Sequence, residues 1–532
     1  MKFNISNWQN KLNLIEPYYF YLFILINLIP VLAFKLFPTV DGPAHLYNSK
    51  LIVELLKDSN GTLNDFFYFN NRINPNWFGH FLLSLFISIF PYFVAEKIVL
   101  LFYLIGLPVS IRFLFKTLSI DNKYLLYLVF PFTYSFLFYY GFYNFNIGLV
   151  LFFWGLGLWI KYINNLTIKR GLILTLFSTL ICLSHLFVFA IFLMLILFVN
   201  ISYILKREFF YKSDIKVISK LYLFQGIALS LGLIITTMYI LNSPIQDMPS
   251  EYIPFNDILT LLIKISPAKG INYGKANIFT QWIFYIIVAL LIYILSFKLH
   301  SLIKWREYKL KNPFWLLISL VTLILVFIIP DSKGAAVGFN THRLILFFFL
   351  FLIIWLASQK VNIWFKVFVF TIISYINFAF VLHNNKSISN NCKIANELVI
   401  ASNNLAPNST VLTITNSDNF IFKHISNYLG VNKPMIILEN YEASLNHFPL
   451  KWNHKEMPQL LFGNFKTGSI GVNWVSSNNE GKVIDYVFIL NDKQNILDNK
   501  CNQEINNCLN SYYKLWYDGI YGNVKILKKN CP

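Results

Sequence analysis

Charged side chains are scarce in this sequence. Only 13% of its 532 residues are Asp, Glu, Lys or Arg, and 56% are hydrophobic, whereas ordinary globular proteins carry roughly 25% charged residues. The mean hydropathy is +0.54. Apolar runs near the roughly 20 residues that span a bilayer as a helix recur from Tyr18 to about Leu382. The composition excludes an ordinary soluble protein and predicts a polytopic α-helical membrane protein.

Acidic residues are the scarcer charge, and their deficit leaves a net charge of +19. Residues 383–532 hold 14 basic and 11 acidic side chains, so +16 of the excess belongs to residues 1–382. The C-terminal part also has no basic patch interleaved with aromatic residues, the pattern typical of nucleic-acid binding. We therefore exclude nucleic acid as a partner and assign the positive charge to membrane topology.

A small-residue cleavage site is missing from the N-terminal stretch "MKFNISNWQNKLNLIEPYYF", which leads directly into an apolar run. We interpret it as a retained cytoplasmic end and not as a cleaved signal peptide. With this end inside, the predicted inner segments hold 20 basic and 5 acidic residues, against 10 and 9 elsewhere in residues 1–382. This is the positive-inside bias. The eleven predicted spans are 18–37, 95–115, 123–140, 144–163, 171–184, 186–205, 217–242, 279–298, 313–330, 342–358 and 362–382.

The stretch "WFGHFLLSLFISIF" at 77–90 is ambiguous, because a full crossing would place the basic segments 112–123 and 161–170 outside. We interpret it as a re-entrant or outer-surface helix within a first outer loop, 38–94. An odd number of spans then places the C-terminal part outside. Its four cysteines suit an oxidising compartment, although both disulfides and unpaired thiols remain open: Cys392, Cys501, Cys508 and Cys531.

Residues 383–532 differ in composition from the apolar part, because they are rich in Asn, Lys and Ser. Short runs typical of strands alternate with helical stretches, which predicts a small α/β domain outside the membrane. The strand runs are "STVLTIT" (409–415), "PMIILEN" (434–440), "DYVFIL" (485–490) and "GNVKILK" (522–528), and the helical stretches are "CKIANELVIASNNL" and "SDNFIFKHISNYLG". We find no nucleophile triad, metal-ligand spacing or phosphate-binding glycine loop there. The domain binds an acceptor, covers a membrane site, or is purely structural.

Ionisable residues are almost absent from the middle of the predicted spans, where an ion-coupled transporter would carry them. Polar residues gather instead at the outer borders. Those that we single out are Asp41, His45, Tyr143, Asn144, His185, Lys269, Lys333, His342 and Arg343. Any chemistry is therefore expected at the outer interface, with the loops of Asp41, His185 and Arg343 converging on one cavity.

The stretch "FPTVDGPAHLYNSKLI" at 37–52 follows the first apolar run. Asp41 is a good N-cap and Pro43 suits a first helical turn, so an amphipathic helix lying on the membrane is predicted. Asp41 and His45 are four residues apart and meet at its start. The plainer explanation is that Asp41 only caps the helix and that His45 lies at the interface.

Arg343 in "GFNTHRLILFFF" lies where the chain re-enters the membrane, close to an anionic headgroup. Arginine holds phosphate with a planar fork of donors and keeps its charge in a partly dry site. A simpler alternative stays open for each of two residues. Arg343 would be an ordinary interfacial anchor, and His185 in "CLSHLFVF" would be a polar residue at a tight turn.

This arrangement resembles the GT-C superfamily of integral-membrane glycosyltransferases, which includes the protein O-mannosyltransferases and the aminoarabinose transferase of lipid A. The resemblance runs from the first-loop acid through "NPNWFGHFLLSLFISIFPYFVAEK" and "CLSHLFVFAIF" to "GFNTHRL". Many relatives have a second acid beside the first, whereas Gly42 follows Asp41 here. The "WWDYG" stretch of the oligosaccharyltransferases is also absent.

The resemblance implies transfer of a sugar from a polyprenyl-phosphate-linked donor to a glycan, lipid or protein acceptor at the outer face of the membrane. It makes Asp41 the general base or a ligand, and leaves a divalent metal ion as an open cofactor. Arg343, with His342, Lys333 or Lys269, would hold the donor phosphate, while His45, Tyr143, Asn144 and His185 would contact substrate.

Two rival classes remain: a flippase or other transporter of lipid-linked glycans, and another envelope enzyme such as a polymerase. The richness in Lys, Asn, Ile and Phe is typical of an AT-rich bacterial genome, which favours the inner membrane. We therefore expect a multi-pass protein among membrane lipids, with a cytoplasmic N-terminus and a periplasmic C-terminal domain.

Overall fold

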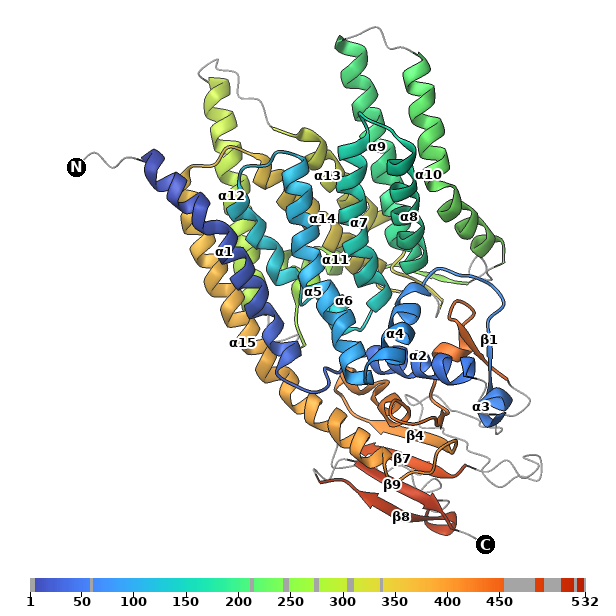
Figure 1. Ribbon diagram of the computed structural model, residues 1–532. Helices are drawn as coiled ribbons and strands as arrows, with labels where there is room; N and C mark the ends of the chain where they lie inside the picture. Colours follow the sequence, from blue (N-terminus) through green and yellow to red (C-terminus); the bar gives the residue numbers. More distant parts are fainter. Residues whose placement is uncertain are drawn as a thin grey trace. The chain divides into compact units, whose positions relative to one another are not determined.

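A computed structural model (Figure 1) describes residues 5–57, 61–210, 215–242, 248–271, 277–303, 311–334, 338–453, 484–491, 509–520 and 524–530. The chain forms two compact units. The first comprises Met1–Ala33 and Leu100–Ser387, and the second comprises Phe34–Val99 and Ile388–Pro532. The second unit thus unites the first loop with the C-terminal residues. The sequence-based division between residues 382 and 383 places these two parts in separate domains.

The first unit is helical. Its central helix, α14 (Asn340–Ser358), is almost completely buried and packs closely on α13 (Pro313–Ile328). The other helices of the unit are α1 (Ile5–Leu32), α6 (Phe136–Tyr139), α7 (Tyr143–Tyr162), α8 (Ile168–Ser184), α9 (Leu186–Phe210), α10 (Ile215–Leu241), α11 (Phe255–Ile263) and α12 (Asn277–Ile303). Helices α5 (Tyr92–Thr117) and α15 (Ile363–Ser402) have residues in both units.

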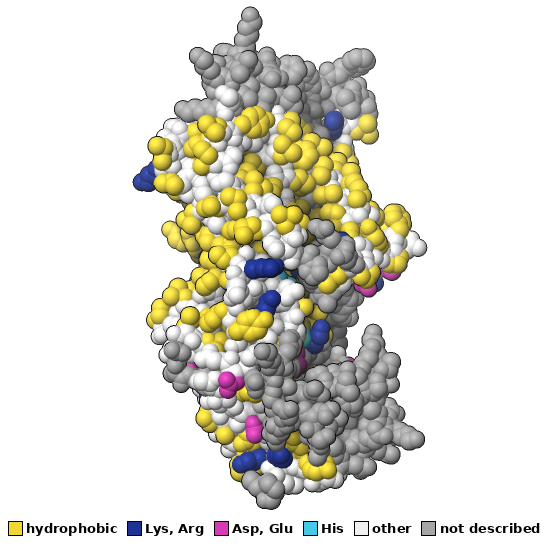
Figure 2. Space-filling model, turned by 90° about the vertical axis from the view of Figure 1, so that its right-hand side faces the viewer, with side chains coloured by type: hydrophobic (Ala, Val, Ile, Leu, Met, Phe, Trp, Pro, Cys, Tyr) yellow, Lys and Arg dark blue, Asp and Glu magenta, His cyan; other side chains and the backbone are white. Residues whose placement is uncertain are grey.

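Among the described residues, seven helices are long and apolar enough to cross a bilayer: Leu14–Leu32, Tyr92–Thr117, Tyr143–Tyr162, Leu221–Leu241, Ile278–His300, Asn340–Ser358 and Ile363–Ser402. Shorter apolar helices are Phe78–Ile89, Leu186–Ser202 and Pro313–Ile328. Apolar side chains cover much of the helical part seen in Figure 2, and exposed residues of α10 include Leu223, Ile227 and Ile234. These helices define a multi-pass membrane protein, while the predicted count of eleven spans is not confirmed.

The predicted span at 123–140 is wrong as a continuous helix. The structure forms a 3-10 helix, η1 (Lys123–Phe132), and then the single turn α6. Pro131 lies inside η1, and the Ser135 hydroxyl caps α6 by accepting a hydrogen bond from the Phe138 backbone N–H. The apolar run is buried in the core of the unit. Its hydrophobicity therefore reflects packing between helices and not a lipid-facing helix.

The second unit contains a five-stranded sheet with the order β5-β4-β7-β9-β8. Strands β5 (Ile436–Ile437) and β7 (Tyr486–Asn491) run parallel to β4 (Thr410–Asn416). Strands β9 (Val524–Lys529) and β8 (Tyr513–Asp518) continue the sheet antiparallel. The four predicted strand runs are confirmed, whereas β8 was not predicted. The predicted helix at 417–430 is wrong, because this stretch forms two 3-10 turns, η4 (Phe420–Phe422) and η5 (Ile425–Gly430).

The first loop supplies α2 (Gly42–Leu56), α3 (Gly61–Phe66), β1 (Phe67–Phe69) and α4 (Phe78–Ile89) to the second unit. Strand β1 pairs with β6 (Leu450–Trp452), with Phe67 opposite Trp452. Two short strands of the first unit, β2 (Ser250–Glu251) and β3 (Ser332–Lys333), form a separate antiparallel pair.

Helix α2 lies in the core of the second unit, which corrects the prediction of an amphipathic helix on a membrane surface. Twelve of its residues are buried, among them Leu46, Tyr47 and Asn48. Tyr47 donates a hydrogen bond to the Met435 carbonyl at 2.6 Å. Asn48 and Asn440 exchange reciprocal side-chain hydrogen bonds of 2.9 and 2.8 Å. Both faces of α2 are therefore covered by protein.

The two cysteines within the described residues, Cys182 and Cys392, are buried free thiols. Cys501, Cys508 and Cys531 lie outside the described residues. Thiols buried in apolar surroundings are poorly reactive.

Candidate functional site

Asp41 occupies the N-cap position of α2, but its carboxylate makes no capping hydrogen bond. The residue has helical backbone angles (φ −91°, ψ −14°), and the Gly42 N–H donates instead to the Thr39 hydroxyl at 3.1 Å. An N-cap residue normally has extended backbone and accepts from the first turn. Capping therefore does not explain why an aspartate stands at this position.

The Asp41 carboxylate faces a polar cluster built by the C-terminal part of the same unit. Its Oδ1 lies 3.7 Å from Nε2 of His424, and Tyr441 hydrogen-bonds to it. The other imidazole nitrogen of His424, Nδ1, pairs with Glu439. The Tyr441 ring stacks on the His424 ring at 4.3 Å between centroids. Glu439 and Tyr441 thus fix the orientation of His424 toward Asp41.

Burial raises the pKa of Asp41, because the charged carboxylate is poorly solvated, and nearby Glu442 adds to this effect. His424, His45 and Lys423 oppose the shift electrostatically. A buried aspartate with an elevated pKa beside an oriented histidine is a stronger proton acceptor than an exposed one. This is an environment in which acid–base residues are commonly found.

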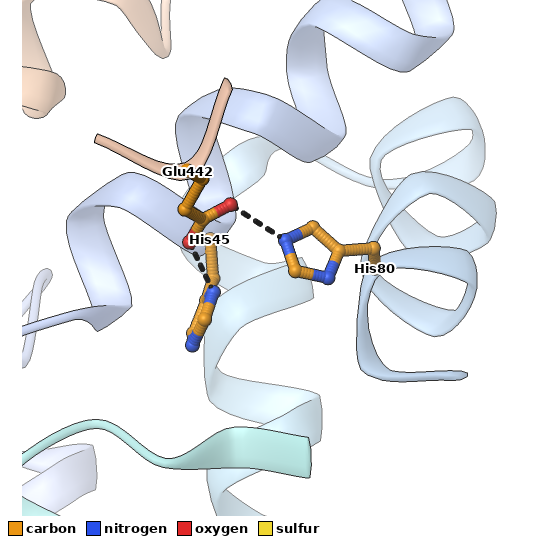
Figure 3. Close-up of side chains that lie close together, drawn as sticks. All are labelled: His45, His80 and Glu442. Atoms are coloured by element: carbon orange, nitrogen blue, oxygen red, sulfur yellow. Dashed lines mark hydrogen bonds and ion pairs between the residues drawn. The ribbon is translucent and has the colours of Figure 1, made fainter. Parts of the chain in front are cut away.

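A second cluster lies beside the first and involves His45, His80 and Glu442 (Figure 3). His45 Nδ1 lies 2.5 Å from Glu442 Oε1, and His80 Nε2 lies 2.8 Å from Glu442 Oε2. The two rings meet edge to face, with centroids 5.0 Å apart. Burial raises the pKa of Glu442, but the two histidines outweigh it and lower the pKa to about 2. Glu442 is therefore a buried, ionised carboxylate held between two imidazoles.

The sequence interpretation found Asp41 and His45 but missed their partners His80, His424, Glu439, Tyr441 and Glu442. These residues lie in stretches that read as apolar helix or as an unspecialised α/β tail. One signal was available, since the chain has only 9 histidines and 25 acidic residues. Scarce polar residues placed among apolar neighbours are candidates for a buried cluster.

The first unit buries Arg343 in the first turn of α14. Its guanidinium lies over the rings of Phe142, Phe145 and Phe187, at 5.0, 5.5 and 5.9 Å from their centroids. One nitrogen donates to Asn340 Oδ1 at 3.3 Å, and Nε is buried without a hydrogen-bond partner among the described residues. Asp331 interacts with this arginine electrostatically, but no described residue forms a direct ion pair with it.

A histidine and a lysine lie near Arg343. His342 interacts electrostatically with Lys269, Arg343 and Asp331, and both of its ring nitrogens are buried without hydrogen-bond partners among the described residues. Lys269 is 3% exposed, and burial together with nearby Lys264 lowers its pKa to about 8. Asp331 accepts a hydrogen bond from the Thr341 backbone N–H at 2.9 Å. The start of α14 is thus an electropositive site with unsatisfied donors.

Three other predicted residues also belong to the first unit. The His185 ring contacts Phe145, and its Nδ1 accepts from the Phe187 N–H at 3.2 Å. His185 therefore shares two aromatic neighbours with Arg343. Tyr143 and Asn144 are buried at the start of α7. Lys333 lies half-buried in β3, opposite Ser250.

The predicted site residues fall into two groups, since Asp41 and His45 belong to the second unit and the others to the first. Their convergence on one cavity stays a prediction. Comparison with known protein families and with curated proteins gives no match. The functional argument consequently rests on the chemistry of the residues themselves.

Proposed function

We propose that this protein is an integral-membrane glycosyltransferase that moves a sugar from a polyprenyl-phosphate-linked donor to a hydroxyl acceptor. The observation that carries the proposal is Arg343, a buried guanidinium in an aromatic setting with an unsatisfied Nε and no ion-pair partner among the described residues. Burying an unpaired charge costs several kcal/mol. An anionic ligand would offset that cost, and a lipid phosphate suits a site at one end of a membrane-spanning helix.

The proposed donor site uses the start of α14. Arg343 offers planar donors for two phosphate oxygens, while Lys269 and His342 add cationic or neutral donors nearby. Lys333 lies in strand β3 and is the weakest member of the set, because its side chain is only half-buried. The aromatic residues around Arg343 exclude water, which strengthens its attraction for phosphate.

The proposed reaction is a displacement at the anomeric carbon. The acceptor oxygen forms a bond to that carbon as the bond to the phosphate oxygen breaks, and the polyprenyl phosphate leaves with the electron pair. Asp41 accepts the proton of the acceptor hydroxyl. His424 stabilises the ionised carboxylate before proton transfer, and Glu439 orients His424. Arg343 and Lys269 offset the charge that develops on the leaving phosphate.

We further propose that the reaction occurs at the outer face of a bacterial inner membrane, with the N-terminus in the cytoplasm. This orientation is supported by the excess of basic residues in the predicted inner segments. The resemblance to the GT-C superfamily supports the same assignment, since its members act with a first-loop acid on lipid-phosphate donors. The second unit would then face the outer compartment and take part in acceptor recognition.

The test is release of polyprenyl phosphate from labelled polyprenyl-phosphate sugars by the purified protein in liposomes. We expect release that depends on an added hydroxyl acceptor, and a loss of about 10²–10⁴-fold in Asp41→Asn. Asp65→Asn, an exposed aspartate of the same loop, is the matched control. Movement of the intact donor across the bilayer without release would instead identify a flippase.

A further inference from the structure

His45, His80 and Glu442 form a group whose ligand atoms all lie within 4.8 Å of one another. Their side chains are almost completely buried, at 6%, 1% and 1% exposure. Both rings are directed at the Glu442 carboxylate, as Figure 3 shows. The three residues come from α2, from α4 and from the turn η6 (Glu442–Ser444). The group is therefore assembled only when the second unit folds.

We propose that His45, His80 and Glu442 bind a divalent transition-metal ion, with Zn²⁺ as the preferred ion. Two imidazole nitrogens and one carboxylate oxygen are a ligand set suited to zinc. Magnesium and calcium prefer sites made of oxygen ligands, and this group offers only one carboxylate. Three protein ligands leave a fourth position of a tetrahedral ion for water or a substrate oxygen.

The charges around the group also favour a bound cation. Glu442 places a carboxylate in a closed site whose nearest neighbours are the imidazoles of His45 and His80. Asp41 adds a second carboxylate near enough to influence Glu442 electrostatically. A divalent cation bound between the two imidazoles would offset the charge of these carboxylates. A metal would also join α2 and α4 to the segment that begins at Glu442.

This inference does not rest on the proposed sugar transfer, because metal binding is measured without any substrate. The first experiment purifies the full chain in detergent, strips it with a chelator, adds Zn²⁺ and removes unbound ion. We expect about one tightly held zinc ion per chain, measured by mass spectrometry of the metal. His80→Ala and Glu442→Gln should lower the zinc content at least about five-fold.

His424→Ala is the matched control, since His424 is also buried and paired with a glutamate in the same unit but is not part of the group. It should keep the zinc content of the unchanged protein. Zinc that stays bound in both group variants would overturn the proposal. So would an unchanged protein that retains no zinc after the exchange.

A second experiment uses only the unchanged protein, so its outcome does not depend on whether a variant folds. Co²⁺ added to the stripped, unchanged protein should give the intense visible absorption of a four-coordinate nitrogen and oxygen site, and Zn²⁺ should remove it by competition. Because the ion binds the folded state and not the unfolded chain, it should also raise the melting temperature by at least about 5 °C. Absence of both signals would contradict a metal site here.

Discussion

His424 Nε2 lies 3.7 Å from Asp41 Oδ1, so that a residue of the first loop and a residue of the C-terminal part share one buried site. Asp41 directly precedes Gly42 and Pro43, which by themselves suffice for a turn. The structure removes capping as the reason for the aspartate. Its carboxylate belongs instead to a cluster with His424 and Tyr441.

The pH dependence of transfer should reflect the Asp41 pKa. Burial raises this pKa above its ordinary value of 3.8, while His424 and His45 oppose the shift. A base acts only when ionised, so activity should be full above the pKa and fall as the pH drops through it. His424→Gln removes a group that lowers the pKa, and the acid limb of the pH–rate profile should therefore move to higher pH.

His300→Gln, an exposed histidine near the end of α12, is the control for this shift and should leave the acid limb in place. An unmoved limb in His424→Gln would mean that Asp41 does not set the profile. Folding of each variant is checked by its melting temperature, since a shift in pH profile has no meaning for an unfolded sample.

Arg343→Lys should weaken binding of the lipid-phosphate donor although the positive charge is kept. Lysine lacks the planar fork of donors and the flat surface that lies over Phe142 and Phe145. Loss of one charge-assisted hydrogen bond of about 1.5–3 kcal/mol predicts a KM for the donor that rises roughly 10- to 100-fold. Arg170→Lys, which also lies over an aromatic ring but outside the site, is the control and should keep the original KM.

Gly430→Ala should destabilise the second unit without touching the proposed chemistry. A Cβ at this position would meet the ring of Tyr47, which is fixed by its hydrogen bonds to Met435 and Ile437. Overpacking of this kind costs about 1–3 kcal/mol. Thermal unfolding should show a lower melting temperature. Gly61→Ala, where a Cβ meets no atom within 4 Å, should melt like the unchanged protein.

The orientation of the second unit can be measured with an alkaline phosphatase fused after Pro532. The positive-inside distribution predicts that the enzyme is active there, because it folds only in the outer compartment. The same fusion after Lys311, in a predicted inner segment, should be inactive. The opposite pair of results would show that the predicted number of crossings before Lys311 is wrong. The stretches 77–90 and 123–140 would then be the first to reconsider.

The sequence by itself determined that this is a membrane protein with an appended strand-containing domain, because hydropathy and charge composition depend on residues and not on contacts. It also located the strands β4, β7 and β9, whose β-branched runs are local signals. It singled out Asp41 and Arg343, since polar residues next to apolar runs are conspicuous. Hydropathy could not separate helices that contact lipid from apolar segments such as η1, which are buried by other helices.

Only the tertiary structure decided what surrounds those residues. His80 and Glu442 lie far apart in the chain and meet His45 because α2, α4 and the segment after β5 pack together. No periodicity encodes such a contact, which depends on long-range packing of apolar side chains. The same packing turned α2 from an expected surface helix into a buried one. Physically, a sequence pattern reports how much apolar surface a segment must cover, whereas the fold decides whether lipid or protein covers it.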